Sequence, residues 1–480
     1  MKRPTIAIAG ASGFIGSALT RALAKDYRVI GLSRRRRPAR DGVEWRACDL
    51  YSLLDVENAL EGCDVAIYLV HSMLPSARLT QASFSDLDLI LADNFARAAA
   101  SRGVRHIVYL GGLVPGGGRE LSPHLASRLE VERTLGAYGT PVTALRAGLV
   151  VGAGGSSLHI LTKLVHRLPL MVLPRWTSSP TQPIALVDVV RAVQRVLAEP
   201  EAHVGAFDIG GPDVMSYREM MERTANVLGS RRRMVPVPLL TPRLSTLWVA
   251  MVTGMPRALV GPLVRSLEHE MVARDNPLLR WLADGALGFE QALEQALFDE
   301  AGAPEPRMAT RSDDRSRLRP ARTVRSVQRL PRPPRATARW VAHEYVRWLP
   351  SVPVPGLRCE TDGPVARFHA LWMRTPLLVL RLDQERTTTD RALFYVTGGL
   401  LARTDGPRPG RFEFRLTPDA RSVVAAVHDF SPTLPWYVYE ATQALGHLVV
   451  MRLFGRHLAR AAAPEVEVRA SPEPQRALRR

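Results

Sequence analysis

At 480 residues the chain exceeds what one ordinary hydrophobic core supports, so its length predicts two or three domains. Hydrophobic residues make up 46% and charged residues 23%, a balance that is typical of a globular soluble protein and excludes a wholly disordered chain. The net charge of +18 would suit a nucleic-acid partner, but residues 301–340 alone carry 11 Arg against three acidic residues. This concentration favours a solvated basic linker, with an anionic partner such as RNA or a lipid surface as the alternative.

The cysteines bear on the cellular compartment. Cys48, Cys63 and Cys359 are odd in number, widely spaced and without a metal-ligand pattern, which argues against a disulfide framework. No signal peptide is apparent ahead of the first predicted strand. We therefore expect a cytoplasmic protein.

The first stretch predicts a dinucleotide site. Ile6–Ala9 is an apolar run without a polar face, typical of a buried parallel strand, and three glycines follow it directly. The first glycine allows a tight turn, the second lets backbone N–H groups approach a pyrophosphate, and the third brings helix and strand close. The helix that follows directs the positive end of its dipole at the phosphates. We assign six residues to this cofactor site: Gly10, Ser12, Gly13, Phe14, Ile15 and Gly16.

The end of the second predicted strand indicates which dinucleotide is preferred. That strand spans 28–33, and four arginines follow where NAD-selective folds place an acidic residue for the ribose hydroxyl. Guanidinium groups favour a 2′-phosphate, so the sequence predicts NADP, with NAD as the alternative cofactor. Ser33, Arg34 and Arg35 are the expected contacts, and a charge run that is only solvated is the alternative interpretation.

Strands and helices alternate further along the chain. Strands are predicted at 45–50, 64–70, 104–112 and 140–146, with a long helix over 84–100. This alternation predicts an α/β fold with a Rossmann-type doubly wound parallel sheet. Because the carboxyl ends of such strands face the ligand, Val70 and His71 are expected beside the cofactor, and His71 and Met73 beside the substrate.

These motifs resemble the short-chain dehydrogenase/reductase superfamily, in its extended or atypical branch with the NmrA-like proteins and the complex I accessory subunit. Bacterial two-domain NAD(P)-binding proteins with a similar segment at 124–128 are a closer likeness. The resemblance implies that Asp49 and Leu50 hold the adenine and that the segment after Arg146 passes over the nicotinamide, with Arg146 among the cofactor residues. Residues 150–300 would build a substrate lobe. The match is carried by Gly10–Gly16, Asp49–Leu50, 145–152, 183–189 and 207–212.

The catalytic positions of that superfamily have changed in this sequence. Its members use a Tyr-x-x-x-Lys pair on the helix between the fifth and sixth strands, with a Ser or Thr ending the fifth strand. This chain contains no Tyr-x-x-x-Lys. When its helix is aligned with that of the superfamily on Glu132 and Leu135, His124 stands at the tyrosine and Arg128 at the lysine. Gly111–Gly112 stands where the serine would be.

Two interpretations of this change stay open. In one, His124 is an alternative acid and base whose ordinary pKa suits neutral pH, and Arg128 keeps a cation over the ribose. In the other, the site binds a dinucleotide without chemistry, as a redox sensor or assembly factor.

Substrate contacts are predicted in the lobe. Residues 170–184 combine aromatic, guanidinium and amide groups, of which Arg175, Trp176 and Gln182 are the expected contacts. The apolar stretch 243–264 is interrupted at Gly254 and Pro256, short of the roughly 20 residues that a transmembrane span needs, so we expect lobe helices there.

Composition divides the chain. We expect an NAD(P)-binding domain with its lobe at 1–300, an Arg- and Pro-rich linker at 301–335, a second domain at 336–463 and a disordered tail at 464–480. In the second domain, five strand-like runs between 366 and 430 precede one long helix over 435–460.

This second domain resembles the α+β helix-grip fold. The likeness implies a cavity for a hydrophobic ligand, and a packing module without a ligand is the alternative. The basic end of the long helix would also suit a membrane surface, so peripheral contact with the inner membrane is a further alternative. The leading hypothesis is an NADP-dependent oxidoreductase acting on a small hydrophobic carbonyl, quinone or isoprenoid-type molecule, with His124 as the proton donor and no nucleic-acid partner.

Overall fold

The computed structural model describes residues 3–39, 42–72, 77, 79–116, 120–167, 170–230, 232–237, 242–254, 257–301, 323–352, 356–370, 372–406 and 408–462. The chain divides into two compact units, Met1–Ala321 and Arg322–Arg480. The predicted tail at 464–480 lies outside the described residues.

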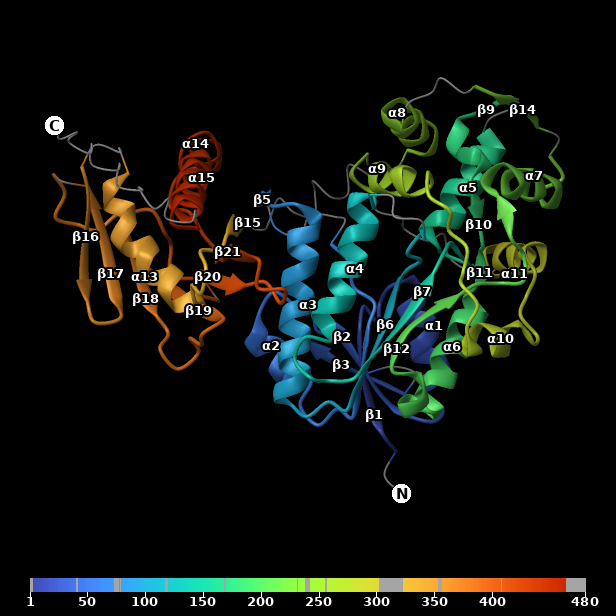
Figure 1. Ribbon diagram of the computed structural model, residues 1–480, viewed down its shortest axis with the longest axis horizontal. Coiled ribbons are helices and arrows are strands. Elements are labelled where there is room, and N and C mark those ends of the chain that lie inside the picture. The colour runs from blue at the N-terminus through green and yellow to red at the C-terminus, as the bar shows by residue number, and fades with distance from the viewer. Residues whose placement is uncertain are drawn as a thin grey trace, which may run out of the picture. The chain divides into compact units, whose positions relative to one another are not determined.

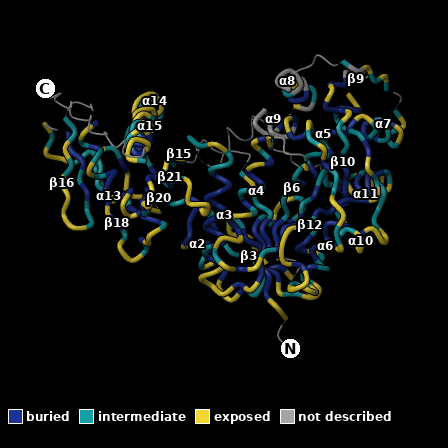
Figure 2. The backbone as a smooth tube through the Cα atoms, in the orientation of Figure 1, coloured by how far each residue is buried: buried dark blue, intermediate teal, exposed yellow. Residues whose placement is uncertain are grey.

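A seven-stranded parallel sheet forms the centre of the first unit (Figure 1). Its order is β3-β2-β1-β4-β6-β7-β12, so the direction of winding reverses between β1 and β4, where such sheets bind ligands. The apolar β1 is buried along its whole length, as a strand covered on both faces requires (Figure 2). The predicted Rossmann-type sheet is confirmed. The strands are β1 (Thr5–Ala9), β2 (Arg28–Ser33), β3 (Val43–Ala47), β4 (Val65–Tyr68), β6 (His106–Gly112), β7 (Val142–Ala147) and β12 (Gly205–Ile209).

Helices cover both faces of this sheet. On one face, Leu19 and Leu23 of α1 and Val193 of α6 share a core with Ile6 and Ile8 of β1. On the other, Phe95 of α3 meets Tyr68 of β4 edge to face, with ring centroids 5.0 Å apart. The helices are α1 (Phe14–Leu23), α2 (Leu53–Ala59), α3 (Phe84–Ser101), α4 (Pro123–Leu135), α6 (Leu186–Ala198) and α10 (Pro277–Ala283).

A lobe with its own hydrophobic core completes the first unit. Leu161 and Val165 of α5, Met220 and Met221 of α7 and Leu293 of α11 belong to that core. The lobe helices are α5 (Ser156–Arg167), α7 (Tyr217–Val227), α8 (Pro242–Thr253), α9 (Arg257–Ser266) and α11 (Phe289–Ala301). The short elements of the unit are β5 (Leu79–Gln81), β8 (Val150–Val151), β9 (Leu170–Leu173), η1 (Arg175–Ser178), β10 (Pro180–Thr181), β11 (Ile184–Ala185), η2 (Pro200–His203), β13 (Met215–Ser216) and β14 (Arg233–Pro236). Among all described residues of the chain, no helix combines the length and the hydropathy that crossing a membrane requires.

The second unit is an antiparallel sheet with helices. Its strands run in the order β16-β17-β18-β19-β20-β21-β15. Tyr345 of α13 packs its ring against Phe412, Phe414 and Phe454, with centroids 5.1–5.4 Å apart. The elements are β15 (Val324–Pro331), α13 (Ala338–Trp348), η3 (Leu349–Ser351), β16 (Leu357–Asp362), β17 (Val365–Ala370), β18 (Leu378–Leu382), β19 (Arg391–Gly398), β20 (Arg411–Leu416), β21 (Ser422–Phe430), α14 (Trp436–Ala441) and α15 (Gln443–Ala462).

The structure corrects three expectations for this region. The predicted linker is wrong over 324–331, where β15 pairs antiparallel with β21. The arginines of this stretch suggested a linker, but its Val324, Val327 and Leu330 are buried, as in a strand. Strand β16 was not predicted. The single helix expected over 435–460 is two helices, because Thr442 leaves the helical conformation at φ −125° and ψ −82°.

Candidate dinucleotide and substrate site

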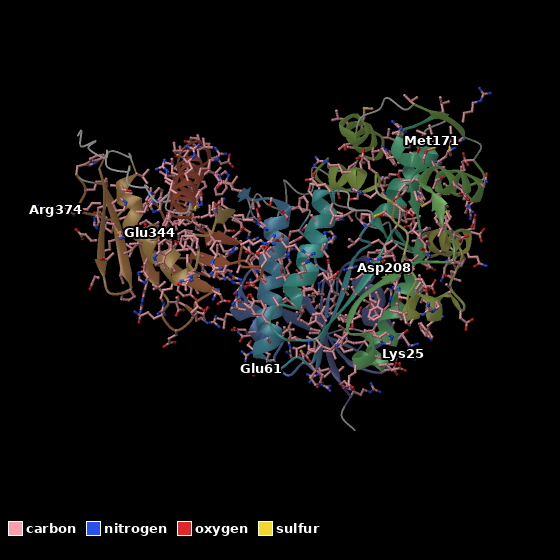
Figure 3. All side chains as sticks on the ribbon, in the orientation of Figure 1. Lys25, Glu61, Met171, Asp208, Glu344 and Arg374 are labelled. Atoms are coloured by element: carbon pink, nitrogen blue, oxygen red, sulfur yellow. The ribbon has the colours of Figure 1, made fainter. Side chains whose placement is uncertain are left out.

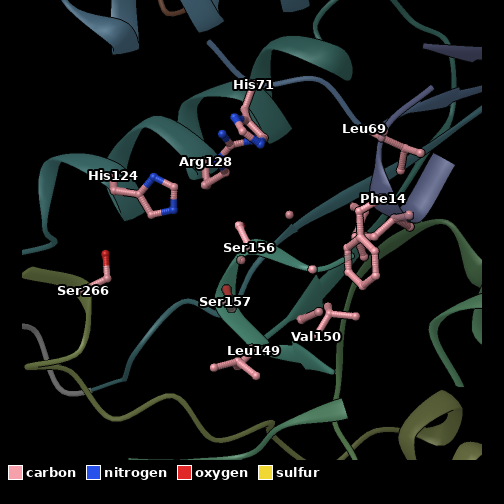
Figure 4. A pocket seen from close by; sticks show the side chains of 18 of the residues that line it. Phe14, Leu69, His71, His124, Arg128, Leu149, Val150, Ser156, Ser157 and Ser266 are labelled. Atoms are coloured by element: carbon pink, nitrogen blue, oxygen red, sulfur yellow. The ribbon is translucent and has the colours of Figure 1, made fainter. Parts of the chain in front are cut away.

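A cavity of about 450 Å³ opens at the carboxyl ends of β1, β4, β6 and β7 (Figure 4). The glycine turn lines one part of it, α4 a second and the lobe a third. Of the predicted site residues, it brings together Gly10, Gly13, Phe14, Ile15, Gly16, His71, His124 and Arg128.

The glycine turn has the geometry that a pyrophosphate requires. Gly10 has φ +88°, in the left-handed region that glycine adopts readily. A Cβ on Gly16 would lie 2.1 Å from the Gly10 carbonyl oxygen, so only glycine lets α1 start this close to β1. Gly13 caps α1 without a side-chain hydrogen bond. The first N–H groups of α1 thus have no capping side chain and are suited to bind an anion.

The residues predicted for the adenosine part lie along the same edge of the sheet. Leu32 of β2 pairs with Ala9 of β1, and Ser33 pairs with Ala47 of β3. The chain therefore leaves β2 into the exposed Arg34 and Arg35 beside the glycine turn. Asp49 and Leu50 follow β3 in the next position along this edge. Seven residues predicted for the cofactor are not part of the cavity wall: Ser12, Ser33, Arg34, Arg35, Asp49, Leu50 and Val70.

Two side chains of α4 face the cavity. His124 and Arg128 are four residues apart, so they lie on one face of the helix, and His71 approaches Arg128 from the end of β4 (Figure 4). Pro123 starts α4, and Ser122 caps it by accepting from the N–H of Leu125. The sequence thus fixes the start of the helix and the direction of both side chains.

Arg128 is held by a buried polar network. Its Nη2 lies 3.4 Å from Oδ2 of Asp88 on α3, and the same oxygen accepts from the Ser127 hydroxyl. The backbone N–H of Ser72 donates to the other oxygen of Asp88 at 2.5 Å. Burial opposes the charge of Arg128, but Tyr109 and Asp88 raise its pKa, so the guanidinium stays charged in the cavity wall.

The fold favours the neutral form of the two histidines in the cavity wall, His71 and His124. Burial and the charge of Arg128 lower the pKa of His124 to about 4. Burial also lowers the pKa of His71, and the positive charges of Arg128 and of protonated His124 lower it further. His124 therefore does not have the ordinary pKa that the sequence led us to expect, whereas its role as a proton donor stays a prediction. Among the described residues its buried Nδ1 has no hydrogen-bond partner, which leaves a polar atom unsatisfied beside the cavity.

Of the two glycines at the position of the missing serine, Gly111 is closed to a side chain and Gly112 is not. Gly111 and Gly112 end β6 and line the cavity. A Cβ on Gly111 would lie 2.8 Å from the ring of Tyr109, whose hydroxyl donates to the carbonyl oxygen of Arg128 at 3.2 Å. Tyr109 therefore occupies the space of the side chain that the superfamily places here.

Arg146 is not part of the cavity wall. It points from β7 to Glu132 of α4, with N–O distances of 2.6 and 2.9 Å, and its Nη1 lies 3.9 Å from Asp208 of β12. Asp208 (labelled in Figure 3) also accepts from Arg274 at 2.7 Å. This network joins two strands to α4 and gives Arg146 a structural role.

The predicted substrate loop also packs differently. Trp176 lies in the lobe core against Tyr217, with ring centroids 6.1 Å apart. Gln182 donates to the Gly211 carbonyl and accepts from the N–H of Ala273, which fixes the loop. Arg175 is exposed and is not part of the cavity wall, and Met73 lies outside the described residues.

The lobe side of the cavity is formed by residues that the sequence did not indicate. Tyr217 starts α7, while Ser266, Leu267 and Met271 follow from the end of α9. These segments reach the cavity only through tertiary packing. Gly154–Ser157, where the chain enters α5, also lines the cavity, and its Gly-Gly-Ser-Ser composition is the one local signal that would have pointed there. In the described part of the chain no group of three His, Cys, Asp or Glu residues is arranged to hold a metal ion.

Comparisons with known proteins agree with this geometry. Residues 6–210 match the sequence model of the NAD dependent epimerase/dehydratase family. Auxiliary protein GraX of Staphylococcus aureus is 35% identical over 145 residues, which are 29% of this chain and 43% of that protein. The ceramide reductase of Caulobacter vibrioides is 29% identical over 246 residues, which are 49% of this chain and 74% of that protein.

A solved structure shares the fold of the first unit. The nucleoside-diphosphate-sugar epimerase of Staphylococcus aureus superposes with a TM-score of 0.50 at 16% identity, covering 60% of this chain and 99% of the epimerase. This likeness concerns the fold alone. Residues 6–210 of the chain are thus similar to the NAD dependent epimerase/dehydratase family, and the first unit shares its fold with this epimerase.

Proposed function

We propose that the first unit binds NADP along β1 and α1 and uses it to interconvert a hydrophobic carbonyl compound and its alcohol, with quinones and isoprenoid-type molecules as related substrates. One observation carries this proposal: His124 and Arg128, one helical turn apart, face the same cavity as the glycine turn. The similarity to a protein named a ceramide reductase supports a reduction and a lipid-like substrate.

The charges of the site fit a carbonyl reduction. Reduction adds a hydride to the carbonyl carbon and a proton to the oxygen, and NADPH supplies the hydride when it is bound. The guanidinium of Arg128, fixed by Asp88, stabilises the negative charge that develops on the oxygen. Arginine keeps its own proton, and neutral His124 offers a hydrogen bond through which a proton from solvent reaches the oxygen.

The cavity wall favours an apolar substrate. Leu149, Tyr217, Leu267 and Met271 form its lobe side, and its described lining includes one guanidinium and no carboxylate or ammonium group. A substrate with a charged diphosphate would find too few cations on this side, since Arg128 is already paired with Asp88. Arg34 and Arg35 support the preference for NADP over NAD, because they follow β2 as exposed guanidinium groups beside the glycine turn.

A non-catalytic NADP-dependent sensor or assembly factor is the second candidate. It is favoured by the closed serine position at Gly111 and by the absence of a Tyr-x-x-x-Lys pair from the sequence. Such a protein would bind the dinucleotide and consume none of it.

Consumption of NADPH separates the two candidates. The full chain is incubated with NADPH and a panel of long-chain ketones and quinones, beside the variants His124→Ala and Arg128→Gln. An oxidoreductase oxidises NADPH with at least one of these compounds, and Arg128→Gln lowers the rate by about 100-fold because the charge on the oxygen loses its partner. NADPH binding without consumption across the panel would favour the sensor.

A further inference from the structure

The tip of the lobe is built from two segments that contain no acidic residue. Residues 156–187 include three Lys or Arg and residues 229–267 include six, with neither Asp nor Glu in either segment. The structure joins them: β9 pairs with β14, and the guanidinium of Arg167 donates to the carbonyl oxygen of Val252 on α8 at 2.6 Å. Figure 1 shows the strands and helices that carry these segments, and six of the nine cationic residues have described side chains: Lys163, Arg167, Arg175, Arg232, Arg233 and Arg265.

Few acids lie next to these segments: Glu268 and Glu270 follow the second one, and α7 carries two more. Glu219 and Glu222 of α7 are engaged by Arg223 and Arg218 of the same helix, at 2.6 and 2.9 Å. Arg232 extends from the start of the second segment to the carbonyl oxygens of Val165 and His166, where it caps the end of α5. The described side chains of the two segments therefore give the lobe tip a net positive charge.

Apolar side chains are exposed on the same surface. Leu247 and Met251 of α8 are 41% and 76% exposed, and their spacing of four residues puts them on one face of the helix. Val249 and Ala250 of the same helix are buried in the lobe core. Val235 of β14 is 44% exposed and adds to this surface. A helix with a buried apolar side normally turns polar residues outward, so this outward apolar face needs a partner.

This surface continues into the cavity wall. α9 packs beside α8, and Ser266 and Leu267 at its end line the cavity. Ser156 and Ser157, at the start of α5, line it from the other segment. The two acid-free segments therefore form both the basic apolar tip and part of the substrate wall.

We propose that the lobe tip docks on an anionic membrane surface and that the substrate is an amphiphilic lipid taken from it. Exposed apolar residues on segments that carry cations and no acid match the acyl boundary and the charged headgroups of such a surface. This inference rests on the proposed function for the identity of the substrate, whereas docking itself does not depend on catalysis.

Sedimentation with vesicles tests the docking. The full chain is mixed with vesicles of phosphatidylcholine alone, or with about 30% phosphatidylglycerol, and spun at low and high ionic strength. We expect binding to the anionic vesicles only, and loss of binding at about 0.5 M salt, where charges are screened beyond a few ångströms. Leu247→Glu with Met251→Glu should lower the bound fraction by about tenfold or more, and Arg233→Gln with Arg265→Gln should lower it as well.

A matched variant tests the other candidate surface. Leu445 and Val449 of α15 are also exposed and also four residues apart, with Arg452 and Arg456 beyond them on the same helix. Leu445→Glu with Val449→Glu should leave vesicle binding unchanged. Equal binding by wild type and the α8 variant, loss with the α15 variant alone, or salt-sensitive binding to duplex DNA in place of vesicles would overturn the proposal.

Gly13→Asp separates docking from the proposed function: it should abolish binding of NADPH and leave vesicle binding intact. Circular dichroism checks that each variant is folded.

Discussion

Arg128 of α4 and Asp88 of α3 form an ion pair in the wall of the cavity, with Nη2 3.4 Å from Oδ2 and both side chains almost wholly buried. Ser72 and Ser127 complete the hydrogen bonding of the carboxylate. The pair sets the direction of the one guanidinium that lines the cavity. Asp88 itself is absent from the cavity lining, so its role is to position Arg128.

Asp88→Asn should destabilise the protein, because it leaves the buried guanidinium without a counter-charge. We expect the free energy of unfolding to fall by about 3 kcal/mol, measured by urea denaturation. Glu222→Gln is the control, since it removes an exposed pair with Arg218 and should cost less than about 1 kcal/mol. Equal losses in the two variants would show that the buried pair has no special role.

Gly16→Ala should abolish dinucleotide binding and destabilise the first unit. The new methyl group would lie 2.1 Å from the Gly10 carbonyl oxygen, so α1 must move away from β1. Overpacking of this kind costs about 1–3 kcal/mol, measured by urea denaturation. Gly446→Ala in α15, where a Cβ meets nothing within 4 Å, should instead stabilise by about 0.5–1 kcal/mol. Unaltered NADPH binding by Gly16→Ala would contradict the assigned cofactor site.

The buried His124 should make stability depend on pH. Its pKa of about 4 lies below the roughly 6.5 of an unfolded chain, so the unfolded state binds more protons between these values. The stabilisation is complete above about pH 6.5 and is lost as the pH falls toward 4, with about 2 kcal/mol lost by pH 5. His124→Gln should remove this part of the pH dependence in urea denaturation at pH 7.5 and pH 5. A variant with the wild-type pH dependence would mean that His124 is not held neutral.

Restoring the superfamily serine should fail at one position and be tolerated at the next. Gly111→Ser places its Cβ 2.8 Å from the Tyr109 ring and should cost about 1–3 kcal/mol of unfolding free energy. Gly112→Ser meets only Leu125 and Arg128 side-chain atoms, at 3.7 and 4.0 Å, and should leave stability nearly unchanged. Thermal unfolding of both variants checks this, and equal melting temperatures would contradict the steric argument.

Local patterns in the sequence sufficed to predict the sheet and the glycine turn. Ile6–Ala9 and the glycines after it carry their structure within a dozen residues, and the two positions of α4 follow from helical spacing. The roles of Arg146 and Gln182 were not predictable in this way. Their partners, Asp208 and Ala273, lie 62 and 91 residues away along the chain and meet them only in the folded unit.

The amino-acid composition of two segments led to wrong predictions of their structure. β15 reads as part of an Arg-rich linker, yet it is held by seven paired positions with β21. Trp176 suggested a ligand contact because it stands beside an arginine, but burial against Tyr217 decided its place. The pKa of His124 was missed for a related reason: burial and the nearby Arg128 charge are properties of the fold.

Binding of NADPH and NADH to the full chain, followed by nucleotide fluorescence, tests the central claim most directly. We expect NADPH to bind about tenfold more tightly or better, and Arg34→Asp to remove this preference by loss of the 2′-phosphate contact. Arg374→Asp in the second unit, an exposed arginine with the same change of charge, should bind like wild type. If neither nucleotide binds, or if both bind equally and Arg34→Asp changes nothing, the first unit is not the NADP site that its cavity indicates.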